Sequence, residues 1–485
     1  MLRLTLRGLS RKSAAEQAAL NYFPPDAEGE VSSYLGAGRE WLAASARITL
    51  ADGRTGRGTA RRKVSRGGTV KDRDECVRRS IYRAALPLLP EPPPWGSLTG
   101  IRPAGLAAGL SETQAGAARI LERKYHVEPE RARLAAECAG AAREERARLG
   151  PRDIALYAGI PFCPSRCAYC SFVSSDASRA RRLIGPFVGR LLEEIALAGH
   201  AAAELGLRPV TLYIGGGTPT VLEPDDLRRV LEALEAAFGT ERCTEITVEA
   251  GRPDTVTAEK LAVLRARGVT RVSVNPQSMR DGVLEAIGRG HTAAQTRGAF
   301  ALARAAGFRT LNADLIAGLP GDTPEGFAAS LEETLAFGPE NLTVHTLALK
   351  KGAAVWKSGG GSRPDAGAVR RMLDGAYARL RGAGYRPYYL YRQKFMAGGF
   401  ENTGWTLPGH ENRYNLHMME ELATVLAVGS GVSKIVRPTG DPDAPRRIGR
   451  IANCKFPLEY LEKRDKIDKN LHQFKALWEG MTTSG

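Results

Sequence analysis

The stretch YAGIPFCPSRCAYCSF, residues 157–172, joins the end of an apolar, strand-like run to a loop that holds three cysteines. This run starts at residue 154, and similar β-branched runs follow at 210–214, 244–248, 271–274, 310–316 and 341–346. Helix-length amphipathic segments separate the runs. Such alternation predicts βαβ units and a parallel sheet, and six units favour a partial, three-quarter barrel over a closed eightfold one. A doubly wound sheet would show the same alternation.

The barrel is expected to span residues 151–363, after the break at Gly150-Pro151. Residues 1–90 predict a small basic α+β module, in which the alternating leucines of the first six residues favour a strand over a transit peptide. Residues 91–150 predict a helical connector. Residues 364–485 predict a substrate-covering region with a long helix, the aromatic strand 387–391, an irregular stretch and a charged helix. The predicted fold class is therefore α/β.

The composition is that of a globular chain, with 485 residues, 43% hydrophobic and 25% charged. No apolar run approaches the 18 residues of a membrane span. The net charge of +16 is concentrated near the N-terminus, since residues 1–90 hold 17 basic and 9 acidic side chains. This charge admits nucleic acid, anionic lipid or a polycarboxylate substrate as a partner.

Three of the seven cysteines, Cys163, Cys167 and Cys170, form a C-x3-C-x2-C loop. Seven cysteines are too few for a disulfide scaffold, which favours a reducing compartment, and we expect a cytoplasmic protein. Thiolates at this spacing can hold one corner of an iron–sulfur cluster. Structural zinc needs four ligands, and no histidine lies within twenty residues of the trio. The loop therefore predicts a 4Fe–4S cluster with one iron left open.

With Tyr169 before its third cysteine, this loop resembles the cluster motif of the radical S-adenosylmethionine superfamily. Three further motifs resemble the oxygen-independent coproporphyrinogen III oxidase family: YAGIPFC at 157–163, GGGTP at 215–219 and NADLIAGLPGDT at 312–323. Its HemZ branch is similar in WGSLTGIRP at 95–103, VNPQSM at 274–279 and YYLYRQK at 388–394. Several motifs in the same order make the resemblance specific.

The resemblance implies two cofactors, a 4Fe–4S cluster on the three cysteines and S-adenosylmethionine beside it. It implies that the glycine turn holds the methionyl amino group, that Gln277 and Arg289 lie near the adenosine and the carboxylate, and that Asp314 lies near the ribose. The implied cofactor contacts are Tyr157, Tyr169, Gly215, Gly216, Gly217, Thr218, Glu249, Gln277, Arg289 and Asp314. From the residues alone, the glycines also fit a tight turn, and both carboxylates also fit a structural salt bridge.

The activity implied by the resemblance is the oxygen-independent conversion of coproporphyrinogen III to protoporphyrinogen IX in haem biosynthesis. A low-potential electron donor such as flavodoxin or ferredoxin is implied as a partner. Aromatic residues of the strand 387–391 are candidates for a wall against the macrocycle. Lys350, Lys351 and Arg392 are candidates for contacts to substrate propionates, whereas His291 and His345 fit either the core or the site.

Two alternatives remain. The well-studied bacterial oxidase has a fourth cysteine two positions after its third cluster ligand, where this chain has Phe172. In this respect the chain is more similar to the haem-chaperone branch, which binds haem instead of oxidising a porphyrinogen. The second alternative is an RNA-modifying radical enzyme that uses residues 1–90 as a basic platform. No stacking-aromatic motif is evident there, so a nucleic-acid partner is not favoured.

Overall fold

The computed structural model describes residues 2–8, 12–23, 27–100, 102–170, 174–348, 364–393, 396–436 and 448–482. The chain forms two compact units: Met1–Glu137 with Tyr391–Glu401, and Cys138–Leu390 with Asn402–Gly485. These bounds differ from the expected ones at both ends of the barrel. The segment 391–401 belongs to the first unit because the Trp95 indole donates to the buried Glu401 carboxylate (2.7 Å) and Arg392 donates to the carbonyl of Leu98 (2.8 Å).

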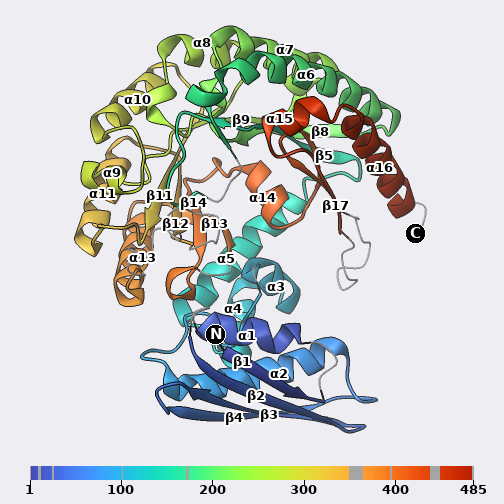
Figure 1. Cartoon of the computed structure of the whole chain (residues 1–485), viewed down its shortest axis with the longest axis vertical. Coiled ribbons are helices and arrows are strands. Elements are labelled where there is room, and N and C mark those ends of the chain that lie inside the picture. The colour runs from blue at the N-terminus through green and yellow to red at the C-terminus, as the bar shows by residue number, and fades with distance from the viewer. Residues whose placement is uncertain are drawn as a thin grey trace. The chain divides into compact units, whose positions relative to one another are not determined.

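The first unit begins with a four-stranded sheet in the order β1-β2-β3-β4, and helices α1 and α2 pack on one of its faces (Figure 1). Strands β1 and β2 are parallel and the other pairs antiparallel. Alternate residues of β3 are buried, which leaves one face polar. The elements of this unit are β1 (Leu2–Arg7), α1 (Ser13–Tyr22), β2 (Gly29–Ala37), β3 (Trp41–Leu50), β4 (Thr55–Lys63), α2 (Val70–Ala85), α3 (Pro103–Leu110), α4 (Gln114–Tyr125) and the start of α5 (Pro129–Arg146).

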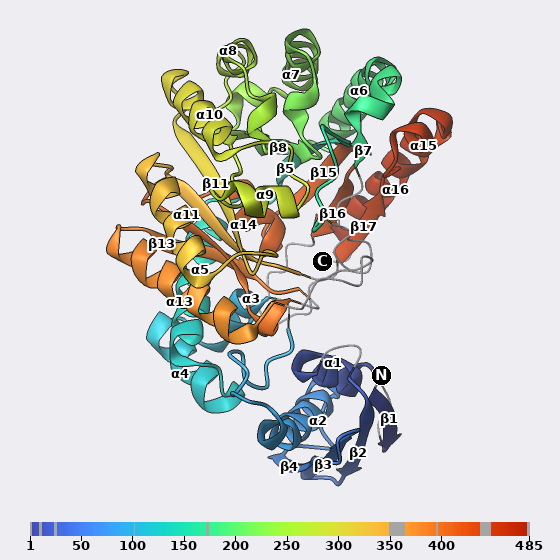
Figure 2. The same ribbon diagram turned by 60° about the vertical axis from the view of Figure 1, so that its left-hand side comes forward.

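The second unit contains the six predicted parallel strands, each in its expected place, and their helices form an arc outside the sheet (Figures 1 and 2). The strands are β5 (Asp153–Ile160), β8 (Arg208–Gly216), β9 (Glu245–Glu249), β10 (Arg271–Ser273), β11 (Thr310–Ala317) and β12 (Asn341–Thr346). The helices are α6 (Ala177–Glu204), α7 (Pro224–Phe238), α8 (Ala258–Ala266), α9 (Asp281–Ala286), α10 (Ala293–Ala305) and α11 (Pro324–Ala336). Two short strands pair beside the cysteine loop: β6 (Phe162–Cys163) leads into the loop, and β7 (Ser175–Asp176) follows it.

The C-terminal region extends this sheet at both edges, which the sequence did not predict. Strand β15 (Thr424–Gly429) runs parallel to β5 as a seventh parallel strand, and β14 (Asn402–Thr406) runs antiparallel to β12. All six residues of β15 are buried, so its sequence lacks the alternation that marks a half-exposed strand. The remaining elements are α13 (Ala366–Gly382), β13 (Arg386–Tyr391), α14 (Arg413–Met419), β16 (Val432–Val436), β17 (Ile448–Ala452), α15 (Pro457–Glu462) and α16 (Asp465–Thr482).

In the residues that the structure describes, the eleven-stranded order ends at β13 and β17 without closing. The predicted α/β fold with a partial parallel barrel is thereby confirmed. The parallel strands bring their carboxyl ends to one edge of the sheet, the edge that carries the chemistry in β/α barrels. None of the described helices combines the length and the apolar character needed to cross a bilayer.

Candidate functional site

The cysteine loop leaves the carboxyl end of β5. None of its three cysteines forms a disulfide, and all three are partly exposed. The loop is tied to the end of α9 by a hydrogen bond from the Ala168 amide to the Ile287 carbonyl (2.8 Å). No three metal-ligating side chains of the described residues meet at one point. A cubane cluster does not need such a point, because each thiolate binds a different iron. Three soft, accessible donors on one short loop therefore fit a 4Fe–4S cluster.

The glycine turn after β8 packs directly on the backbone that leads into Cys163. The amides of Gly217 and Thr218 donate to the carbonyls of Ile160 and Phe162, both at 2.7 Å. A Cβ on Gly217 would lie 2.3 Å from the Phe162 carbonyl oxygen, and Gly216 has φ +109°. Only glycine permits both this approach and this conformation. The turn and the cysteine loop therefore form one rigid corner, in which the Thr218 hydroxyl lies 3.6 Å from the Cys163 thiol.

Two carboxyl groups lie near each other on β9 and β11, two strands that β10 separates, and they differ in ionisation. Burial, together with the nearby charge of Asp314, raises the pKa of Glu249 to about 7, although the Tyr213 hydroxyl donates to it. Burial also opposes ionisation of Asp314, but hydrogen bonding and charge from His345 outweigh it and lower its pKa. The Asn312 amide donates to Asp314 as well (2.9 Å). Glu249 therefore titrates near neutral pH, whereas Asp314 is ionised there.

Gln277 holds a conformation that is uncommon for a residue with a side chain. Its φ is +66°, and its backbone bridges β11 through bonds to the Asp314 carbonyl (2.8 Å) and the Ile316 amide (3.0 Å). Its buried Oε1 has no hydrogen-bond partner among the described residues. Strain of this kind and an unsatisfied buried acceptor both concentrate at functional sites. The Gln277 side chain therefore retains a hydrogen-bond acceptor that the described residues do not use.

Arg289 links the second half of the site to the cysteine loop. Its guanidinium donates to the Asn275 carbonyl (2.7 Å) and the Tyr169 hydroxyl (2.8 Å), and it lies 3.9 Å from the Cys167 thiol. Burial disfavours its charge, but Tyr169 and Cys167 outweigh burial and raise the pKa of Arg289. Its Nε has no partner in the described part of the chain. A fixed positive charge therefore stands beside the predicted cluster.

Two tyrosines of this region were not predicted from the sequence. The rings of Tyr157, Tyr213 and Tyr414 stack, with centroids 4.6 Å apart between the last two. Tyr213 lies two residues before the glycine turn, so strand alternation could have placed it on the same face as Gly215. Tyr414 comes from α14, far along the chain, and its sequence carries no indication of this contact.

Apart from His345, the substrate candidates described next lie elsewhere or outside the described residues. Tyr388 and Tyr389 are core side chains of β13, with ring centroids 4.8 Å apart. The buried Arg392 lies over the Trp95 ring and donates to the carbonyls of Leu98 and Gly399, so it stabilises the first unit. His345 is a partner of Asp314 at 3.6 Å. Two remaining candidates, Lys350 and Lys351, fall outside the described residues, as does Phe172 of the cluster motif.

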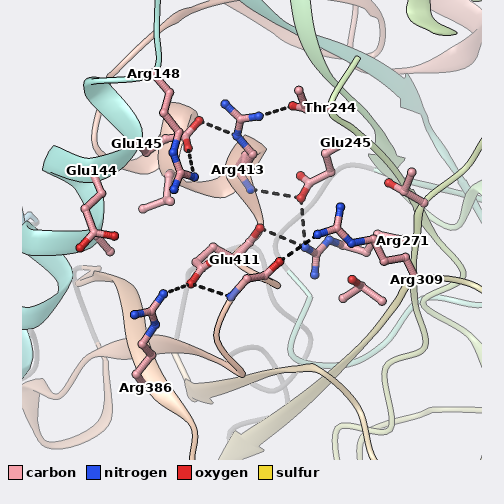
Figure 3. A pocket seen from close by; sticks show the side chains of 15 residues that line it. Glu144, Glu145, Arg148, Thr244, Glu245, Arg271, Arg309, Arg386, Glu411 and Arg413 are labelled. Atoms are coloured by element: carbon pink, nitrogen blue, oxygen red, sulfur yellow. Dashed lines mark hydrogen bonds and ion pairs between the residues drawn. The ribbon is translucent and has the colours of Figure 1, made fainter. Parts of the chain in front are cut away.

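A cavity of about 400 Å³ lies at the opposite, amino ends of the strands and contains none of the predicted site residues (Figure 3). Its charged side chains pair with one another. Arg271 donates to Glu245 (3.0 Å), Arg413 to Glu145 (2.7 Å), and Arg386 to Glu411. His417 also bonds Glu145 (2.7 Å). Most of the charge in this cavity is thus satisfied within the protein.

The Radical SAM superfamily model matches residues 157–334, which include the cysteine loop, the glycine turn and both carboxylates. The solved structure of coproporphyrinogen III oxidase (HemN) from Escherichia coli has the same fold, with a TM-score of 0.53 and 24% identity over 67% of this chain and 71% of that chain. The fold and the cysteine motif define a radical S-adenosylmethionine protein. Its cofactors are a 4Fe–4S cluster and S-adenosylmethionine.

Similarity to curated proteins shows which family of radical S-adenosylmethionine proteins the chain belongs to. The oxygen-independent coproporphyrinogen-III oxidase-like protein HemZ of Bacillus subtilis is 38% identical over 80% of this chain and 78% of its own length. The haem chaperone HemW of Escherichia coli is 28% identical over 64% and 76%, and the oxygen-independent coproporphyrinogen III oxidase of Pseudomonas aeruginosa is 31% identical over 49% and 52%. The chain belongs to the oxygen-independent coproporphyrinogen III oxidase family, in its HemZ branch.

Proposed function

We propose that this protein oxidatively decarboxylates coproporphyrinogen III to protoporphyrinogen IX. In the proposed reaction, each of two propionate side chains gives a hydrogen atom from its β-carbon to a carbon-centred radical. It then loses carbon dioxide and passes one electron to an acceptor such as the oxidised iron–sulfur cluster, and a vinyl group remains. The observation that carries the proposal is a site with vacant hydrogen-bonding capacity at the carboxyl ends of the strands, in a chain with HemZ-like similarity over 80% of its length. When bound, the two cofactors supply a carbon-centred radical that can abstract such a hydrogen atom.

Under this proposal, Cys163, Cys167 and Cys170 hold three irons of the cluster and leave the fourth open to S-adenosylmethionine. Arg289 offsets the negative charge that three thiolates bring into a partly buried loop, since its guanidinium lies 3.9 Å from the Cys167 thiol. The backbone hydrogen bonds of Gly217 and Thr218 hold the glycine turn at a fixed position relative to the cysteine loop. Its backbone contacts at 2.7 Å leave little room for relative movement.

The other side chains match the polar groups of S-adenosylmethionine. The ionised Asp314 is a suitable acceptor for ribose hydroxyls, and the unpartnered Oε1 of Gln277 for an adenine or ribose donor. Glu249, with its pKa near 7, can accept from the methionyl ammonium. The stacked rings of Tyr157, Tyr213 and Tyr414 form an apolar wall behind it that keeps water away from this side.

The direct test is an anaerobic incubation of the reconstituted protein with coproporphyrinogen III, S-adenosylmethionine and dithionite. Protoporphyrin, detected by fluorescence after oxidation of the products, should accumulate together with methionine and 5′-deoxyadenosine. Product should be absent without S-adenosylmethionine and in Cys167→Ser. The Cys243→Ser variant, which removes a lone thiol outside the loop, should keep the wild-type rate.

The alternative, a haem chaperone, is favoured by the similarity to HemW and by Phe172 in place of a cysteine. Cleavage of S-adenosylmethionine without any vinyl product would overturn the oxidase proposal. Stoichiometric haem binding by the same preparation, followed in the Soret band, would then establish the chaperone function. Because both measurements use one reconstituted sample, a poorly loaded cluster would be recognised from its iron content and excluded.

A further inference from the structure

The N-terminal sheet has one bare, strongly basic face. Helices α1 and α2 cover the other face, where Val31, Leu42 and Ile48 are fully buried (Figures 1 and 2). The bare face, here called the outer face, is formed by the alternate exposed residues of β1–β4. Its basic side chains are Arg3, Arg7, Arg47, Arg57, Arg61 and Lys63.

The charge of the outer face is not neutralised within the protein. In the described part of the chain none of these six side chains forms an ion pair, whereas Arg54 and Arg62 nearby do. The single acidic side chain of the outer face, Glu30, accepts a hydrogen bond from the Thr5 hydroxyl (2.9 Å). Six like charges on one small sheet repel one another, and an anionic partner relieves that repulsion.

Two large aromatic side chains share the outer face. Tyr34 is 55% exposed and Trp41 is 45% exposed, and the Arg61 guanidinium lies 5.3 Å from the Trp41 ring. Tyr34 lies between Arg7 on β1 and Ser45 on β3 in the sheet register. The sequence shows no stacking motif here, because these rings come from different strands and only the sheet brings them to one surface. Exposed rings flanked by cations can stack on nucleic-acid bases.

A groove of about 430 Å³ crosses the outer face between these groups. The residues that line it include Thr5, Ser32, Ser45, Thr59, Arg7, Arg47 and Arg57. In the register, Thr5, Ser32, Arg47 and Arg57 lie opposite one another across four strands, a distance of about 14 Å. This width matches the two or three nucleotides that a four-stranded RNA-binding sheet contacts.

We propose that the outer face binds single-stranded RNA, with arginines on the phosphates and Tyr34 and Trp41 stacked on bases. A lipid surface would also use the cations and the rings, whereas the hydroxyl side chains Thr5, Ser32, Ser45 and Thr59 among the lining add groups that can bond phosphates and 2′-hydroxyls. This function is separate from the chemistry of the barrel, so it does not depend on which tetrapyrrole reaction the protein performs.

The test uses the full chain and a fluorescein-labelled oligouridine of about twelve nucleotides, followed by fluorescence anisotropy. Between about 50 and 200 mM salt the logarithm of the association constant should fall against log salt with a slope of about −2 to −3, as three or four phosphate contacts require. The double variant Arg47→Glu/Arg57→Glu should weaken binding at least about tenfold. Tyr34→Ala should weaken it about fivefold or more, and Tyr34→Phe should retain it.

The matched control is Arg119→Glu/Arg265→Glu, which changes the net charge equally at exposed positions of α4 and α8. It should leave RNA affinity within about twofold. Equal weakening by both double variants would overturn the proposal, since binding would then follow net charge alone. Inorganic polyphosphate as competitor tests stacking: an equal effect of Tyr34→Ala on polyphosphate and RNA would exclude it. Binding to phosphatidylserine-rich vesicles but not to RNA would assign the face to a membrane and also overturn the proposal.

Discussion

Strand β9 begins with Glu245 and ends with Glu249. The partners of these two carboxylates show how the amino and carboxyl ends of the parallel strands differ. Glu245, at the amino end, accepts from Arg271 (3.0 Å) and from the amides of Arg413 and Tyr414 (both 3.3 Å). Glu249, about 13 Å away, faces a tyrosine hydroxyl and a second carboxylate, and burial raises its pKa to about 7. The charge of Glu245 is paired within the protein, whereas that of Glu249 has no cationic partner among the described residues.

This difference locates function better than the presence of a cavity or the number of charges does. The amino-end cavity is lined by several charged residues, but its ion pairs hold together strands, α5 and α14 (Figure 3). Each end has an arginine whose buried Nε lacks a partner in the described residues, Arg271 and Arg289, but only the carboxyl-end site has an orphaned acceptor on a strained backbone, the Oε1 of Gln277. Groups left unsatisfied at a cost in folding free energy are those that a ligand can complete. Substitutions at the two ends should therefore fail in different ways.

The largest effect is expected for Cys167→Ser, which removes one cluster ligand at the carboxyl end. Iron in the anaerobically reconstituted protein should fall below about a tenth of the wild-type content, and the brown colour should disappear, because a cubane needs its three thiolates. Iron and sulfide analysis with the visible absorption spectrum measures this. The thermal unfolding of the apoprotein should change little, since the Cys167 side chain is partly exposed.

Cys243→Ser is the matched control for this prediction. Cys243 precedes β9, at its amino end, and burial raises the pKa of its thiol to about 12, so it is a poor cluster ligand. The variant should bind iron as the wild type does. Full iron content in Cys167→Ser, or an equal loss in Cys243→Ser, would contradict the assignment of the cluster to the loop.

At the amino end, Arg271→Met should reduce stability without emptying the site. The guanidinium of Arg271 also donates to Asn341 and to the carbonyls of His410 and Glu411. Its removal leaves the Glu245 charge buried with two amide partners, which costs about 3–5 kcal/mol of unfolding free energy. Denaturant unfolding of the apoprotein measures this cost. Samples reconstituted at low temperature should keep wild-type iron content.

The double variant Arg271→Met/Glu245→Gln tests the cause of that loss. Without the buried carboxylate, the double variant should recover about 1–3 kcal/mol relative to the sum of the two single changes. Strict additivity would show that Arg271 stabilises the fold through its other contacts and not through the charge of Glu245. Loss of iron in folded Arg271→Met would show that the amino end contributes to the cofactor site, and the contrast between the ends would not hold.

The sequence predicted the carboxyl end far better than the amino end. Residues at the carboxyl end, such as Cys163 and Gly217, lie in short motifs at fixed spacing directly after strands, so their positions follow once the βα rhythm is recognised. Arg271, Glu145 and His417 lie in no motif, and their pairing depends on how α5 and α14 pack. Strand β15 was missed for a related reason, since a buried parallel strand shows no alternation.

The titration of Glu249 gives a pH-dependent prediction of intermediate size. Its pKa is about 7 in the folded chain against an ordinary value of 4.5, so between these values the unfolded chain is ionised while the folded chain holds the proton. Stability should fall as the pH rises through this window, by roughly 3 kcal/mol at most. Glu249→Gln should remove this contribution and become more stable than the wild type at and above pH 7.

Unfolding of both apoproteins by denaturant, at several pH values across the window, measures the difference. The difference is needed because burial also raises the pKa of Glu194 to about 7, so the wild-type curve contains both groups. Parallel curves for the wild type and Glu249→Gln would show that Glu249 is already ionised in the folded chain. The two ends of β9 would then be alike in charge state.

The smallest effect on stability is expected at Gln277, where function and folding oppose each other. A residue with a side chain pays about 1–2 kcal/mol to adopt the left-handed conformation, and glycine does not. Glycine in turn lowers the unfolding free energy by about 0.4–1 kcal/mol, because its unfolded chain has more conformational freedom. Gln277→Gly should therefore gain up to about 1 kcal/mol in unfolding free energy. Because the variant loses the orphaned Oε1, its affinity for S-adenosylmethionine should fall about tenfold, measured by calorimetry on the reconstituted protein.

Arg66→Gly is the control, because Arg66 has φ +50° in an exposed turn of the N-terminal module. It should show a similar small gain in stability with unchanged affinity for S-adenosylmethionine. If Gln277→Gly is destabilised and binds the cofactor normally, the side chain of Gln277 stabilises the fold. Its strained backbone would then be no evidence for a contact with the ligand. A gain in stability paired with a loss of affinity is the result that separates a strained functional residue from a strained structural one.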